Sequence, residues 1–119
     1  MALRRCSWWQ GRQGAPETSS ATGVEAVVLS RGAEPTMAII DGARMVATPP
    51  PVAPADHRGS GDAMTGALAV GLTCDLTGLT LLALGCAAGA ASATRHGLAT
   101  ADAHLIAELA HRTQVRTSL

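Results

Sequence analysis

Residues 56–69 have the sequence Asp56-His57-Arg58-Gly59-Ser60-Gly61-Asp62-Ala63-Met64-Thr65-Gly66-Ala67-Leu68-Ala69 and predict a glycine-containing loop followed by a helix. Small and apolar residues recur there at helical spacing. The residues that this spacing places on one face are Met64, Ala67, Leu68, Gly71 and Leu72. The loop is therefore expected to lie at the N-terminus of a helix with one buried face.

The loop is a candidate phosphate site. Glycines on both sides of Ser60 let the backbone approach a ligand and turn successive N–H groups toward it, and the helix N-terminus adds partial positive charge. Asp62 would repel a bound anion. A carboxylate at this position is explained if it accepts a proton from a nucleophile that attacks the phosphate. The alternative interpretation is a flexible turn at residues 59–61 with Asp62 as a helix cap.

Other phosphate and nucleophile motifs fail on spacing. A Walker A loop needs Lys after its second glycine; Gly61 and Gly66 have the spacing, but Ala67 follows and the chain has no Lys. A dinucleotide fingerprint would need Gly in place of Met64, and a nucleophile elbow would need Gly in place of Arg58. These three motifs are excluded.

Upstream of the loop, the pattern predicts strands. Residues 26–29 form a short continuous apolar run, typical of a strand buried on both faces, and residues 30–32 end it in a turn. The β-prone runs 37–40 and 43–47 flank Asp41-Gly42, a pair that favours the type I′ turn of a hairpin. A hairpin is therefore expected after the first strand.

An extended connector and two further helices are expected after the hairpin. The proline-rich residues 48–54 cannot continue a ladder or a helix. Helices are predicted over residues 77–94 and 101–112, with a last short strand from Val115. The buried stripe of the last helix is predicted to be Leu105, Ile106, Leu109 and Ala110.

The uncharged run 76–94 is long enough for a membrane helix, but its many small residues favour a buried helix, with a membrane association as the alternative.

Composition restricts the class of protein. Nine Arg balance nine acidic residues, and the two Trp are the only aromatic residues, so we expect no nucleic-acid partner. Three Cys without a C-x-x-C pair indicate neither a disulfide framework nor a zinc site, and no metal site is expected. Reduced thiols and the lack of a signal-peptide pattern predict a cytoplasmic protein without a membrane segment. Residues 1–23 are polar and aperiodic, which predicts a disordered tail or linker.

The segment 56–69 resembles the C-terminal signature of the PfkB, or ribokinase-like, carbohydrate kinases, D-T-x-G-A-G-D-x-F-x-G-A-L. Three further features fit: residues 27–34 resemble the strand and turn next to the nucleotide, Thr48–Pro51 resembles the proline run of the phosphofructokinase-like branch, and an alanine-rich helix ends at Thr94–Leu98. The resemblance covers residues 24–119. It implies an α/β fold, the C-terminal part of a truncated three-layer α/β/α sandwich.

The resemblance implies phosphoryl transfer from ATP to the hydroxyl of a sugar or hexose phosphate. Asp62 would be the catalytic base, and the N–H groups of Gly59, Ser60 and Gly61 would hold the charge on the transferring phosphoryl group. Asp56 matches an acid that in some members helps to bind a monovalent cation such as K⁺. Two further residues would lie near the nucleotide, namely Ser30 and Gly32.

Several positions depart from the family pattern. His57-Arg58 replaces Thr-x, Ser60 replaces Ala, Met64 replaces an aromatic residue, and Pro35 stands where a second Gly is frequent. A solvated Arg58 is expected, with pairing to phosphate or to Asp56 as alternatives. The family's sugar-binding residues and usual Mg²⁺ ligands have no counterpart here. Activity is therefore expected to need the missing N-terminal half or a homo-oligomer, and a non-catalytic nucleotide-binding or vestigial fragment is the alternative.

Overall fold

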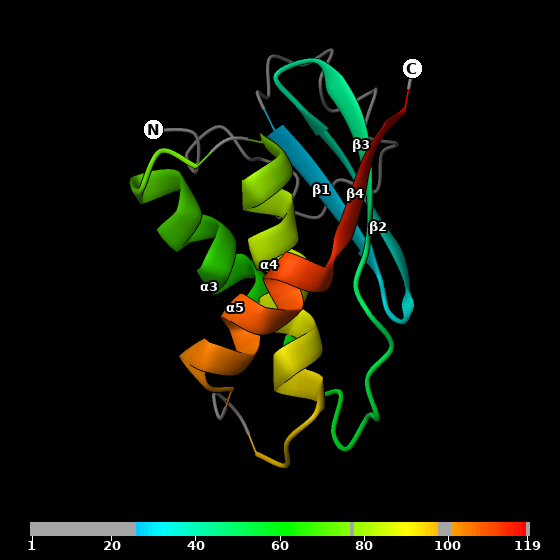
Figure 1. The fold of residues 1–119 in the computed structure, drawn as a ribbon, viewed down its shortest axis with the longest axis vertical. Helices are drawn as coiled ribbons and strands as arrows, with labels where there is room; N and C mark the ends of the chain where they lie inside the picture. Colours follow the sequence, from blue (N-terminus) through cyan, green and yellow to red (C-terminus); the bar gives the residue numbers. More distant parts are fainter. Residues whose placement is uncertain (1–25, 77, 98–100, 119) are drawn as a thin grey trace. The chain divides into compact units, whose positions relative to one another are not determined.

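The computed structural model describes residues 26–76, 78–97 and 101–118. The chain divides into two compact units, one of residues 47–115 and one of residues 1–46 with 116–119. The tail or linker predicted for residues 1–23 lies outside the described residues. Figure 1 gives the order of the elements along the chain.

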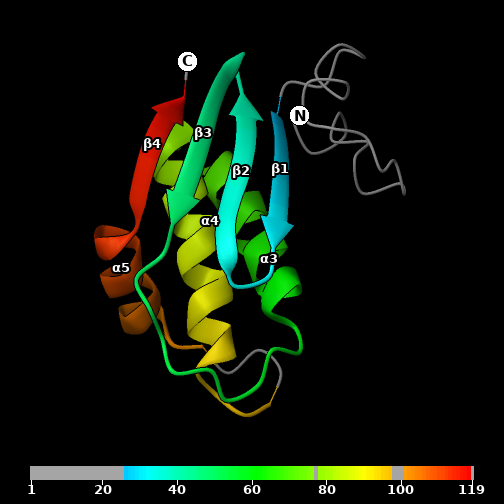
Figure 2. The ribbon, with the colours of Figure 1, turned by 90° about the vertical axis from the view of Figure 1, so that its right-hand side faces the viewer.

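The strands form one sheet. They are β1 (Ala26–Arg31), β2 (Glu34–Ile40), β3 (Ala43–Thr48) and β4 (Gln114–Ser118), and their order in the sheet is β1-β2-β3-β4. Neighbouring arrows point in opposite directions (Figure 2). The predicted hairpin at Asp41-Gly42 joins β2 to β3, with φ values of 50° and 80° at these two residues. Positive φ at both residues is the requirement of a type I′ turn, so the hairpin prediction is confirmed.

The prediction that the first strand is buried on both faces is wrong. Val27 is buried, but Leu29 is 41% exposed. Met37, the residue of β2 that pairs with Leu29, is 37% exposed. β1 lies at the edge of the sheet and pairs in antiparallel fashion with β2. A continuous apolar run cannot distinguish such an edge strand from a central one, because the run is too short to show alternation.

β1 is also longer than predicted, and it contains an irregularity. It runs to Arg31, two residues beyond the predicted end, and the turn consists of residues 32 and 33. Pairing shifts between Leu29 and Arg31, because one β1 residue, Ser30, lies opposite two residues of β2. One of these two is Pro35, which has no N–H to donate to the ladder, and prolines in strands occur at such bulges.

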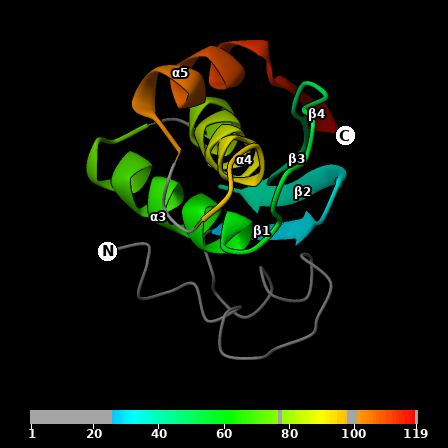
Figure 3. The ribbon, with the colours of Figure 1, turned by 90° about the horizontal axis from the view of Figure 1, so that it is seen from below.

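The three helices follow the predicted positions. They are α3 (Ser60–Thr73), α4 (Gly78–Ala93) and α5 (Ala103–Arg112), and α4 contacts both of the others (Figure 3). Ten of the sixteen residues of α4 are buried, which makes it the central helix. Leu68 and Gly71 are buried on the predicted face of α3. Within the described residues, no helix is long and apolar enough to cross a lipid bilayer.

α5 begins two residues later than predicted, because Asp102 caps it. The Asp102 carboxylate accepts hydrogen bonds from the backbone N–H groups of His104 at 2.7 Å and Leu105 at 3.1 Å. Leu109 packs with Ala87 and Ala91 of α4, and Leu105, Ile106 and Ala110 pack around this cluster. The predicted stripe is confirmed.

Gly71→Ala should destabilise the helical unit by about 1–2 kcal/mol, because of crowding in a packed core. A Cβ at Gly71 would lie 2.5 Å from Leu81 Cδ1 and 3.2 Å from Leu76 Cδ1. Gly66→Ala in the same helix is the control: its Cβ meets nothing within 4 Å, so it should stabilise by about 0.5–1 kcal/mol through helix propensity. Urea unfolding measures both, and equal effects would contradict close packing at Gly71.

Candidate active site

The loop before α3 (residues 55–59) is tied to the end of α4. The backbone N–H groups of Ala55 and Asp56 both donate to the carbonyl oxygen of Ala93, at 2.8 and 3.2 Å. Ala93 is the last residue of α4, and carbonyls at a helix end have no partner within the helix. The loop therefore satisfies one of these carbonyls and is fixed in place by it.

A tight turn connects the loop to α3. The Ser60 N–H donates to the His57 carbonyl at 3.3 Å, and the Ser60 hydroxyl donates to the same oxygen at 3.0 Å. Gly59 has φ 77° and ψ 0°, the values of the third residue of a type II turn. Only glycine adopts this conformation without strain, which explains the first glycine of the segment.

Two backbone N–H groups at the start of α3 are available to a ligand. Ala63 N–H is bonded to the Gly59 carbonyl at 2.9 Å, whereas among the described residues no acceptor pairs with the N–H groups of Gly61 and Asp62. A Cβ built on Gly61 would meet nothing within 4 Å. The open space and the free donors fit an anion such as a phosphoryl group. Ser60 contributes less than predicted, because its N–H already has a partner.

The Asp62 carboxylate is exposed in the first turn of α3. The helix begins without a side-chain cap, and Asp62 has no hydrogen-bond or ion-pair partner among the described residues. The alternative of Asp62 as a hydrogen-bonding helix cap is therefore wrong. An unpaired carboxylate beside free N–H donors is positioned to accept a proton from a group that approaches the same space.

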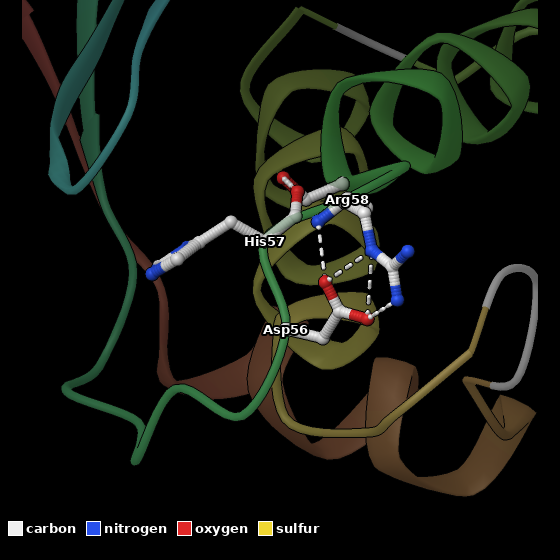
Figure 4. A network of polar contacts seen from close by, with 4 residues as sticks. Asp56, His57 and Arg58 are labelled. Carbon is white, nitrogen blue, oxygen red and sulfur yellow. Dashed lines mark hydrogen bonds and ion pairs between the residues drawn. The ribbon is translucent and has the colours of Figure 1, made fainter.

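Asp56 is paired with Arg58, and only 12% of its side chain is exposed (Figure 4). Arg58 Nε lies 3.0 and 3.2 Å from the two carboxylate oxygens, and a terminal guanidinium nitrogen of Arg58 lies 2.7 Å from Oδ2. The Arg58 backbone N–H donates to Oδ1 at 3.0 Å. These bonds, with a smaller contribution from the Gly97 N–H, hold the pKa of Asp56 well below its usual range. Arg58 is thus solvated, as expected, and it also forms the pair with Asp56 that was the alternative: two of its guanidinium nitrogens bond to the carboxylate, while its side chain is exposed and His57 points away from the pair.

Gly89 of α4 lets the start of α3 approach closely. A Cβ on Gly89 would lie 3.3 Å from the Ser60 carbonyl oxygen and 3.7 Å from Met64 Cβ. Sequence reasoning assigned no role in this site to Gly89 or Ala93. Their spacing of four residues places both on one face of α4, but nothing in the sequence indicates that the loop lies against that face.

The predicted site residues fall into two sets. Asp56, Gly59, Ser60, Gly61 and Asp62 lie together within the unit 47–115. Ser30 and Gly32 belong to the other unit, and both are exposed. Ser30 lies within β1 opposite the bulge, and Gly32, with φ 62°, lies in the turn that follows β1. The roles proposed for Ser30 and Gly32 stay predictions.

The family model described as pfkB family carbohydrate kinase matches residues 12–104. The chain belongs to this family. No curated protein sequence matches the chain. The PfkB membership confirms the resemblance found at residues 56–69.

Crystal structures of other proteins have a similar fold. A Staphylococcus aureus protein described as a phosphofructokinase has 17% identity and a TM-score of 0.78, over 98% of this chain and 40% of that chain. Phosphofructokinase-2 from Escherichia coli in complex with potassium has 23% identity and a TM-score of 0.76, over 81% of this chain and 31% of that one. The chain thus spans less than half the length of these kinases. Its fold is part of the α/β fold of PfkB kinases, as predicted.

Asp56→Asn should remove a pH-dependent contribution to stability. A carboxyl whose pKa is lowered in the folded state stabilises the protein above its unfolded pKa of about 3.9, and this stabilisation is lost as the pH falls toward the folded pKa. The difference in unfolding free energy between the wild type and Asp56→Asn should therefore shrink as the pH is lowered from about 5 to 2. The stability of the wild type alone also depends on Asp102, because hydrogen bonds from Leu105 and His104 lower the pKa of that carboxyl. The difference between the two proteins removes this contribution. A difference independent of pH in urea unfolding would contradict the ion pair.

Proposed function

We propose that this chain provides the phosphate-binding and catalytic part of an ATP-dependent kinase of sugars or sugar phosphates. The observation that supports this most directly is the start of α3, where the free N–H groups of Gly61 and Asp62 lie beside the unpaired Asp62 carboxylate. ATP would supply the phosphoryl group that is transferred. Membership of the PfkB family supports the reaction class.

In this proposal, the N–H groups of Gly61 and Asp62 hold negative charge on the phosphoryl oxygens, and Gly59 and Ser60 shape the turn that presents them. Donors fixed in the folded protein need no reorganisation when charge develops, which is the largest contribution in many phosphoryl-transfer sites. The Asp62 carboxylate accepts the proton of the attacking sugar hydroxyl. No described residue forms an ion pair with Asp62, which leaves both oxygens able to do so.

The acceptor class is proposed from the relatives. E. coli phosphofructokinase-2 is known in complex with fructose-6-phosphate, and this structure has 25% identity to the chain with a TM-score of 0.66. A hexose phosphate is therefore the proposed acceptor. We propose that the sugar pocket comes from polypeptide beyond these 119 residues or from a second subunit; an inhibited form of E. coli phosphofructokinase-2 is tetrameric. The cytoplasm, where ATP and sugar phosphates are found, is the proposed location.

The cations proposed for the family fit this chain poorly. Among the described residues, no group of three or more His, Cys, Asp or Glu is arranged to hold a metal ion, so no residue of this chain is proposed as a Mg²⁺ ligand. E. coli phosphofructokinase-2 binds potassium. The corresponding candidate in this chain, Asp56, already has both oxygens bonded to Arg58.

ATP should raise the melting temperature of the chain, since a ligand that binds only the folded state stabilises it by RT ln(1 + [L]/Kd). At a hundredfold excess over Kd the gain is about 2.7 kcal/mol. Thermal unfolding with and without Mg²⁺ and ATP measures it. An unchanged transition at millimolar nucleotide would contradict the proposed phosphate site.

Asp62→Asn should separate binding from catalysis. Removing the carboxylate removes repulsion of the phosphates, so ATP should bind about fivefold more tightly, from roughly 1 kcal/mol of Coulomb energy at about 4 Å in water. Phosphoryl transfer to fructose-6-phosphate should fall by about 10²–10⁴-fold. Asp75→Asn, which changes an exposed acid after the end of α3, is the matched control. Transfer is measured in the assembly that supplies the sugar pocket. Unchanged transfer there in Asp62→Asn would remove Asp62 as the base, and ATP binding without any transfer by the wild type in that assembly would favour a non-catalytic nucleotide-binding role.

Gly61→Ala tests the proposed phosphate site at the N–H groups of Gly61 and Asp62. Its Cβ would meet no protein atom within 4 Å, so the fold should remain stable. A methyl group on the residue whose N–H is proposed to bind the phosphate should lower ATP affinity about tenfold or more. Gly66→Ala adds the same group to the same helix, also in open space, and should leave affinity unchanged. Equal affinities of the two variants in a titration would place the phosphate elsewhere.

A further inference from the structure

The Asp56 carboxylate is a nearly buried charge in the loop before α3. Only 12% of its side chain is exposed. A charge removed from water needs a partner charge or several hydrogen bonds. Because Asp56 N–H is also one of the two groups that bind the Ala93 carbonyl, the state of this side chain affects the position of the whole loop.

Arg58 supplies the compensating charge from inside the same loop. The guanidinium contacts both carboxylate oxygens through two of its nitrogens, and the Arg58 backbone N–H adds a third donor to Oδ1. A fork of parallel charge-assisted hydrogen bonds is the strongest arrangement for an Arg–carboxylate pair. Its geometry is set locally, because the two residues are separated by His57 alone.

A metal cation and this guanidinium cannot share the carboxylate. The donors from Arg58, with the N–H of Gly97, occupy acceptor positions on an oxygen pair that offers about four. A monovalent cation at the same oxygens would also meet a full positive charge within a few ångströms, and this repulsion is stronger in a partly buried site than in water. The Asp56–Arg58 pair therefore leaves no suitable site for potassium at the Asp56 carboxylate.

We infer that the Arg58 guanidinium is a built-in counter-ion of Asp56 which takes the place of a monovalent cation, so that the order of the loop before α3 does not depend on potassium. The inference goes beyond the proposed function, since it concerns the ion requirement of the loop. Its test measures folding and loop protection, so its failure is distinguishable from a failure of phosphoryl transfer.

The test compares KCl with tetramethylammonium chloride at an equal ionic strength of about 0.1 M, because tetramethylammonium has the charge of K⁺ but cannot be coordinated. Two quantities are measured on the 119-residue chain: the melting temperature, and hydrogen exchange of the Ala55 and Asp56 amides, which report opening of the loop from Ala93. Both should be the same in the two salts for the wild type. Higher stability or protection of the wild type in KCl would overturn the inference.

Removing the guanidinium should create a potassium requirement. In Arg58→Gln, amide protection should fall about tenfold or more in tetramethylammonium chloride and recover in KCl, because K⁺ then neutralises Asp56. Arg58→Ala should behave in the same way, so the conclusion does not depend on one variant folding well. Arg112→Ala removes an exposed Arg that lies 3.8 Å from Glu108 within α5, and it should change nothing in either salt. Equal loss of protection in both salts for the Arg58 variants would overturn the inference, since the loop would then need the hydrogen bonds of Arg58 rather than a positive charge.

Discussion

The hydrogen bonds from Ala55 and Asp56 to the Ala93 carbonyl are the constraint on which the candidate site depends. They join the loop before α3 to the end of α4, a helix whose residues are mostly buried and uncharged. Asp56 then orients Arg58, the turn at Gly59 follows, and α3 begins with Gly61 and Asp62 N–H groups free. A ligand site on a loop gains precision when the loop is fixed by a rigid helix, and here that helix is α4.

Small residues make this arrangement possible without any Phe or Tyr in the chain. Leucine and alanine side chains bury less area than aromatic ones, so the helices must approach closely to form a core. Gly71 receives leucine side chains from α4, and Gly89 admits the Ser60 carbonyl of α3. Gly59 serves a different purpose, since its positive φ is required by the turn. The glycines thus act either through close approach or through backbone conformation.

The sequence predicted most elements because each has a local cause. Asp41-Gly42 determines its turn by conformation alone, the stripe of α5 follows helical periodicity, and the segment 56–69 matches a family signature. Contacts between distant segments could not be predicted in this way. The exposure of Leu29 depends on the position of β1 in the sheet, and the role of Ala93 depends on a loop almost forty residues earlier in the chain. The bulge opposite Ser30 has a local signal in Pro35, whose missing N–H favours a bulge, but the comparison with the family pattern indicates only the loss of a glycine there.

The two carboxylates at this site have opposite environments, and this difference supports the different roles that we propose for them. Asp56 is nearly buried, bonded on both oxygens and held as an anion by Arg58, so it cannot accept a proton near neutral pH and acts as a structural charge. Asp62 is exposed, and within the part of the chain that the structure describes neither its carboxylate nor the neighbouring N–H groups have a partner. If Arg58 were bonded to Asp62 instead, the proposed base would be occupied and the buried Asp56 would be left without a counter-ion. Pairing within residues 56–58 avoids both problems, because the short His57 linkage keeps the guanidinium on Asp56 and leaves Asp62 available for proton transfer.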